Sequence, residues 1–143
     1  MEKTELSQLK RILLPVEDTG ASMRACKSAA FLAKLTGAKV KLLNCHANLP
    51  SYVSAYVPKN IQEDAIKESR EILKKFIDCL DEEGVTHEEV IYKGDPGPTI
   101  IEEINKEKYD LVVMGKTERS LPILASVMDR IIYNTKQPVM IVH

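Results

Sequence analysis

Long apolar runs are missing from this sequence, and their absence excludes one class of protein. No stretch reaches the ~18 consecutive apolar residues that a membrane-spanning helix needs. The first ten residues, Met1 to Lys10, alternate charged and polar side chains and lack the apolar core of a secretory signal peptide. We therefore expect a cytoplasmic protein with no membrane partner.

An excess of charge of either sign is also missing. The sequence has 20 basic and 21 acidic residues, scattered along the chain, and a net charge of -1 at pH 7. A protein that neutralises many phosphates of DNA or RNA needs a basic stripe or patch. Nucleic acid is therefore not an expected partner.

Cysteine is scarce as well. Cys26, Cys45 and Cys79 are odd in number and far apart, and no C-x-x-C motif is present. This pattern argues against a disulfide framework and a zinc site, and it favours free, mostly buried thiols. The histidines, which are His46, His87 and His143, lack the i, i+4 spacing that places two imidazoles on one metal ion. No metal site is predicted.

What the sequence does contain is typical of one globular domain. It has 143 residues, of which 44% are hydrophobic and 29% charged. We expect a single domain over residues 1–143. Short apolar runs predict five strands, at Arg11–Val16, Ala38–His46, Val85–Lys93, Tyr109–Met114 and Val139–Val142.

Helical patterns separate these runs. The first helix follows Asp18 and Thr19, whose side chains can cap it, and Gly37 suits a left-handed C-terminal cap. The second spans Ile61–Glu83, the third follows a turn in which Asp95 is the expected N-cap, and the fourth carries Leu124 to Ile132. Strands that alternate with helices predict a doubly wound α/β fold, with helices on both faces of a mostly parallel sheet.

In such a sheet, ligands bind beyond the carboxyl ends of the strands, where the strand order reverses. The loops that begin at Glu17 and Gly115 are therefore the candidate site, and the segment Met114 to Val127 holds most of it. Gly115-Lys116-Thr117 matches the end of a phosphate-binding P-loop. However, Asp110 stands where that motif has its first glycine, so the motif is absent, and no G-x-G-x-x-G follows a strand.

Catalytic groups are few. Cys45 and His46 are adjacent, but neighbouring side chains of a strand point to opposite faces and cannot hydrogen bond to each other. Glu17 and Asp18 are paired carboxylates at a strand end, which fit either acid–base chemistry or a helix N-terminus. We expect no catalytic residue and no enzyme activity.

Four ordered segments together resemble the universal stress protein family. They are RILLPVEDTGASMRACKSAAFLAKLTGAKVKLLNCH, GDPGPTIIEEI, YDLVVMGKTERS and ASVMDRIIYNTKQPVMIVH, and they cover nearly the whole chain. The resemblance implies a five-stranded parallel sheet and a homodimer formed through Val139–Val142. In one branch of the family it also implies ATP bound at the ends of the first and fourth strands.

The phosphate end departs from the pattern of the ATP-binding branch, which is G-x-x-G, nine residues, then G-[ST]. Gly115 supplies the first glycine, but Glu118 and Ala125 replace the other two, and the loop is three residues short. Pro122 removes a backbone donor. Ser126 is retained, and Glu17 is one methylene longer than the family's acidic residue near adenine.

Three hypotheses follow. The first is a dimeric, non-catalytic stress-response regulator that has lost standard ATP binding. The second is a member with a rebuilt pocket for ATP or another adenine nucleotide, and the third is a hydrolase of a small anion. The resemblance implies these nucleotide-binding residues: Pro15, Val16, Glu17, Cys45, Met114, Gly115, Lys116, Ser126 and Val127.

Overall fold

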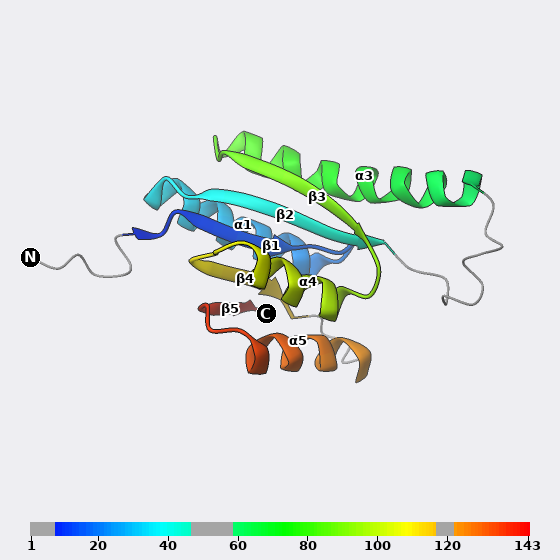
Figure 1. Cartoon of the computed structure of the whole chain (residues 1–143). Helices are drawn as coiled ribbons and strands as arrows, with labels where there is room; N and C mark the ends of the chain where they lie inside the picture. The colour runs from blue at the N-terminus through cyan, green and yellow to red at the C-terminus, as the bar shows by residue number, and fades with distance from the viewer. Residues whose placement is uncertain (1–7, 47–58, 117–121) are drawn as a thin grey trace, which may run out of the picture.

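The computed structural model describes residues 8–46, 59–116 and 122–143, with side chains for 8–46, 63–116 and 127–143. Strands and helices alternate along these residues (Figure 1). The strands are β1 (Arg11–Pro15), β2 (Lys39–His46), β3 (His87–Lys93), β4 (Leu111–Gly115) and β5 (Val139–Val142). The helices are α1 (Gly20–Thr36), α3 (Lys59–Glu82), α4 (Pro96–Lys106) and α5 (Pro122–Asn134).

The five strands form one parallel sheet in the order β3-β2-β1-β4-β5. The chain moves outward from β1 to β3, crosses back over the sheet, and continues outward on the other side from β4 to β5. The strand order therefore reverses between β1 and β4. This arrangement confirms the predicted doubly wound α/β fold and the predicted point of reversal.

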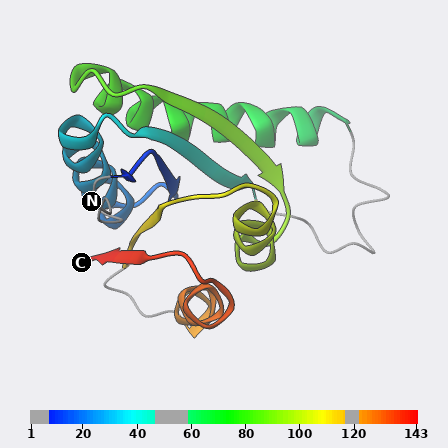
Figure 2. The same cartoon turned by 60° about the vertical axis from the view of Figure 1, so that its left-hand side comes forward.

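Two helices cover each face of the sheet. Helices α1 and α3 pack on one face, and α4 and α5 pack on the other (Figures 1 and 2). Because side chains alternate along a strand, β1 contributes to both cores: Ile12 and Leu14 lie under α1 and α3, and Leu13 lies under α4 and α5. All three side chains are fully buried.

The ends of α1 follow the sequence signals. The Thr19 hydroxyl oxygen accepts a hydrogen bond of 3.1 Å from the backbone N–H of Ser22, so Thr19 is the N-cap. Gly37 has a φ of 76°, and its N–H donates to the Ala33 carbonyl at 2.7 Å. This confirms the predicted left-handed cap, which glycine adopts without steric strain.

Several local predictions need correction. Strand β1 ends at Pro15 and not at Val16, and Gly115 is the last residue of β4. Strand β3 begins at His87, because the N–H of Val85 instead donates to the Leu80 carbonyl and closes the end of α3. Asp95 occupies the N-cap position of α4, but its side chain makes no capping hydrogen bond.

A buried carboxylate lies between α4 and the sheet. The Glu103 side chain has no exposed surface, and it accepts hydrogen bonds from the hydroxyls of Tyr92 at 2.6 Å and Tyr109 at 2.9 Å. The Lys41 ammonium of β2 lies 3.4 Å from the same carboxylate. A buried charge is tolerated only when it is paired and hydrogen bonded, and these donors meet that condition.

Ion pairs also join elements at the amino end of the sheet. The Arg11 guanidinium lies 2.7 Å from Glu107, which follows α4. At the far edge, His87 contacts two carboxylates: Nε2 lies 2.6 Å from Asp81 and Nδ1 lies 2.6 Å from Glu89. An imidazole that hydrogen bonds to carboxylates through both nitrogens must carry both protons.

Candidate functional site

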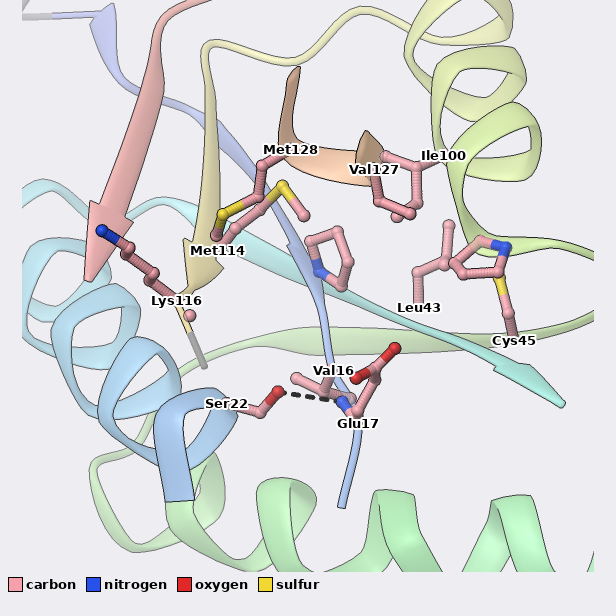
Figure 3. A pocket seen from close by; sticks show the side chains of 13 residues that line it. Val16, Glu17, Ser22, Leu43, Cys45, Ile100, Met114, Lys116, Val127 and Met128 are labelled. Atoms are coloured by element: carbon pink, nitrogen blue, oxygen red, sulfur yellow. Dashed lines mark hydrogen bonds between the residues drawn. The ribbon is translucent and has the colours of Figure 1, made fainter. Parts of the chain in front are cut away.

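A pocket opens at the carboxyl ends of the central strands, at the point where the strand order reverses (Figure 3). Its volume is about 100 Å³, several times what one water molecule needs. Eight of the nine nucleotide-binding residues implied by the family resemblance line it. They are Pro15, Val16, Glu17, Cys45, Met114, Gly115, Lys116 and Val127.

The ninth residue, Ser126, is part of α5, but its side chain is not among those that the structure describes. Glu118, near the expected phosphate end, also lies outside the described residues. Pro122 is the first residue of α5. Since the N–H of a first helical residue has no partner within the helix, proline is well suited to this position.

Five further residues line the pocket that sequence reasoning missed: Ser22, Leu43, Pro96, Ile100 and Met128. Pro96 and Ile100 come from α4, which starts at the carboxyl end of β3 and therefore lies beside the same edge of the sheet. The turn Gly94-Asp95-Pro96 could have indicated these two residues, because it starts α4 at that edge of the sheet. Leu43 of β2 could be predicted only from its register with Pro15 of β1, which the sequence does not give.

The floor and one wall of the pocket are apolar. Leu43, Ile100 and Met114 belong to the core between the sheet and α4 and α5, and Val127 and Met128 of α5 pack against that core. In Figure 3 these side chains surround the pocket from the sheet and from both helices. Such a surface fits a flat apolar or aromatic group better than a strongly hydrated one.

Glu17 provides the acidic group in the lining of the pocket. Its backbone N–H donates to the Ser22 hydroxyl at 2.9 Å, shown as a dashed line in Figure 3. The preceding residue is also fixed, because the side-chain amide of Asn44 donates to the Val16 carbonyl at 2.8 Å. Burial raises the pKa of the Glu17 carboxyl. The neighbouring carboxylates of Glu17 and Asp18 thus have different surroundings, because Oδ1 of Asp18 lies 2.7 Å from Nζ of Lys75.

Cys45 is not an activated nucleophile. Burial raises the pKa of its thiol to about 11, and the nearby charges of Glu17 and Asp95 act in the same direction, whereas a hydrogen bond with Thr99 acts against them. A thiol in this state is protonated at neutral pH and reacts slowly. His46 is not among the lining residues, in agreement with the expectation that neighbouring strand side chains point apart.

Gly115 has a structural reason to be glycine. A Cβ at this position would collide with the carbonyl group of Ala21 and would lie 2.8 Å from the backbone N of Ser22. The first turn of α1 therefore rests directly on the end of β4. The next residue keeps the sheet intact, because the Lys116 N–H donates to the Val142 carbonyl at 2.7 Å. The resemblance explained Gly115 by phosphate binding, and this close contact is an additional requirement.

Comparison with known proteins agrees with this architecture. Residues 8–143 match the model of the universal stress protein family. The chain belongs to the universal stress protein family. Among described residues, no group of three or more His, Cys, Asp or Glu side chains is placed to hold a metal ion. No described helix is both long enough and apolar enough to cross a membrane.

Individual members of the family are similar to this chain over most of its length. Universal stress protein MJ0531 of Methanocaldococcus jannaschii is 33% identical, and the alignment covers 93% of this chain and 81% of that protein. The Archaeoglobus fulgidus universal stress protein in complex with dAMP is 20% identical, with a TM-score of 0.72, and 94% and 98% of the two chains are covered. An Arabidopsis thaliana family protein with AMP bound is also 20% identical, with a TM-score of 0.70 and coverage of 93% and 90%.

Proposed function

We propose that this universal stress protein is a cytoplasmic, non-catalytic binding module that holds an adenine nucleotide in the pocket between β1 and β4. The observation that carries the proposal is the pocket itself. It lies at the point where the strand order reverses, and eight of the nine implied binding residues line it. Two solved relatives, from Archaeoglobus fulgidus and Arabidopsis thaliana, hold dAMP and AMP.

The nucleotide is a monophosphate rather than ATP. The apolar walls suit adenine, and Lys116 is the one cationic side chain among the described lining residues. Beyond it, the sequence replaces two glycines of the ATP-binding pattern with Glu118 and Ala125 and shortens the loop. A carboxylate about 4 Å from a phosphate oxygen costs roughly 1 kcal/mol in water and about 4 kcal/mol near a protein surface. A triphosphate therefore gains little here over a monophosphate.

The same residues support binding without catalysis. The Cys45 thiol is protonated, and Glu17 is the one carboxylate among the described residues that line the pocket. Acid–base hydrolysis uses a second positioned group to activate water. We expect no release of phosphate from ATP above the rate of a Glu17→Gln variant. Release that depends on Glu17 would contradict this part of the proposal.

Isothermal titration calorimetry with AMP and ATP tests the ligand. We expect saturable binding of AMP, with ATP binding no more tightly. Val127→Trp should weaken AMP binding by roughly tenfold or more, because the indole fills the pocket. Asp129→Trp is the matched control, since it adds the same bulk to an exposed position on the same helix. No AMP binding, or equal loss in both variants, would refute the proposed site.

The module is a homodimer joined along β5. This strand ends the order of the sheet, so its outer edge has no partner among the described strands. Met140 on β5 is 38% exposed, and Ile132 and Tyr133 on α5 are 50% and 85% exposed. An apolar edge strand is usually covered in solution.

Light scattering after size-exclusion chromatography tests the dimer. We expect the mass of two chains for the wild type and of one chain for Met140→Asp, because a carboxylate would have to be buried in the interface. Phe31→Asp, on the outer surface of α1, is the control and should remain dimeric. A wild-type monomer at tens of micromolar would refute the proposal.

A further inference from the structure

Two of the three cysteines, 53 positions apart in the sequence, meet in the structure. Cys26 of α1 is fully buried in the core under α1 and α3, and Cys79 of α3 is partly buried and packs against that same core. Both thiols are free. Cys26 and Cys79 are therefore far apart in the sequence but not in the folded protein.

The helix geometry places both thiols at the same turn of α3. The Cys26 Sγ lies 3.9 Å from the backbone carbonyl oxygen of Phe76 on α3. Cys79 follows Phe76 by three residues, which is about one turn. Since side chains of a helix lean toward its N-terminus, the Cys79 thiol covers the turn that Cys26 contacts.

The contact also affects the chemistry of the buried thiol. Burial raises the pKa of Cys26, and the neighbouring Cys79 side chain raises it further through its charge and a hydrogen bond. Cys26 is thus held as a neutral thiol that solvent does not reach. Cys79, which retains exposed surface, is the sulfur that an oxidant meets first.

We propose that Cys26 and Cys79 form a redox pair, which a hydroperoxide converts into a disulfide between α1 and α3 and which a dithiol reductant restores. No other pair of cysteines is so placed among the described residues, because Cys45 lies on the opposite face of the sheet, in the core under α4 and α5. This inference is independent of the proposed nucleotide binding.

The reaction balances in two steps. The Cys79 thiol gives up its proton and its sulfur attacks one oxygen of the hydroperoxide; the O–O bond breaks, the departing oxygen takes up a proton and leaves as alcohol or water, and Cys79 becomes a sulfenic acid. The Cys26 sulfur then attacks the Cys79 sulfur; an S–S bond forms, the S–O bond breaks, and the hydroxide leaves with the Cys26 proton as water. Two electrons pass from the dithiol to the peroxide.

The disulfide would fix α1 against α3, the two helices that cover one face of the sheet. Helix α1 also reaches the pocket, because Ser22 accepts a hydrogen bond from Glu17 and the first turn rests on Gly115. A cross-link across a loop of this length reduces the entropy of the unfolded chain. We expect the oxidised protein to melt roughly 5–10 °C above the reduced protein.

Mass spectrometry of the folded, full-length protein tests the pair. After treatment with hydrogen peroxide, the wild type should lose 2 Da, and a digest without reductant should contain a peptide linking Cys26 to Cys79. Dithiothreitol should reverse the loss. Cys79→Ser and Cys26→Ala should not lose 2 Da, whereas Cys45→Ser should behave as the wild type. The two single variants provide separate tests should one of them fold poorly.

Other products would overturn the inference. These are a gain of 16 or 32 Da at Cys79 with no loss of 2 Da, a linkage that involves Cys45, or a disulfide between two chains on a non-reducing gel. A cross-link that forms only after unfolding in urea would also overturn it. A linked protein that melts at or below the reduced form would refute the expected locking of α1 to α3.

Discussion

Replacing Gly115 with alanine tests how the pocket is built. The new Cβ would collide with the Ala21 carbonyl group and would lie 2.8 Å from the Ser22 nitrogen. Ordinary contacts between such atoms begin near ~3.5 Å. These neighbours are backbone atoms of the first turn of α1, so they cannot rotate away, and either β4 or the helix must move by more than about half an ångström.

The expected cost is that of overpacking a rigid site, about 1–3 kcal/mol of unfolding free energy. Urea denaturation followed by circular dichroism measures it, as a lower midpoint with an unchanged m value. Ser22 would move with the helix, and its hydroxyl accepts the hydrogen bond of the Glu17 N–H at 2.9 Å. Gly115→Ala should therefore also weaken AMP binding.

Gly97→Ala is the matched control. A Cβ there would lie 3.6 Å from Cδ of Arg130 and 3.7 Å from Cγ2 of Val127, which are ordinary contacts with side chains. Because Gly97 lies in α4, alanine should leave stability unchanged or raise it by up to about 1 kcal/mol. If the two variants had the same midpoint, the close approach of α1 to β4 would be refuted.

Three further predictions concern the charged groups around the sheet. Burial opposes the charge of His87, but hydrogen bonds with its two flanking carboxylates raise its pKa overall. The stabilisation from His87 is therefore full below about pH 6.5 and declines as the pH rises through the pKa of the folded state. The melting temperature of His87→Gln should depend less on pH across this range. A hydrogen bond from Arg11, with further ones from Lys41 and Tyr109, lowers the pKa of Glu107 to about 2. Stability should therefore fall as the pH is lowered from about 5 to 2, and it should fall less steeply in Glu107→Gln. The same pH dependence of the unfolding free energy in both proteins, measured by urea titration, would contradict this. Lys41→Met should lower the unfolding free energy by about 3–5 kcal/mol, because it leaves the Glu103 carboxylate buried without its cation. If adding Glu103→Gln to this variant restored no stability, the pairing of Lys41 with Glu103 would be contradicted.

The local signals in the sequence predicted elements better than side-chain roles. Gly37 ended α1 as expected because its αL conformation depends only on the adjacent backbone. Asp95 was placed correctly at an N-cap, yet it makes no capping bond, since the orientation of a side chain depends on its tertiary neighbours. Glu17 and Asp18 were indistinguishable as a pair of carboxylates. In the structure, one lines the pocket and the other pairs with Lys75.

The order of strands and helices can be predicted from the sequence alone, because apolar periodicity and caps act over a few neighbouring residues. The sequence also located the pocket, because right-handed crossovers leave few topologies for that order, and the reversal of strand order fixes the binding edge. Which distant residues come into contact is settled only in the folded structure. At the pocket, Gly115 rests against α1 and Ile100 joins the lining, and on the opposite face of the sheet Cys26 and Cys79 share one core. These contacts depend on packing between elements far apart in the chain, which no local pattern records.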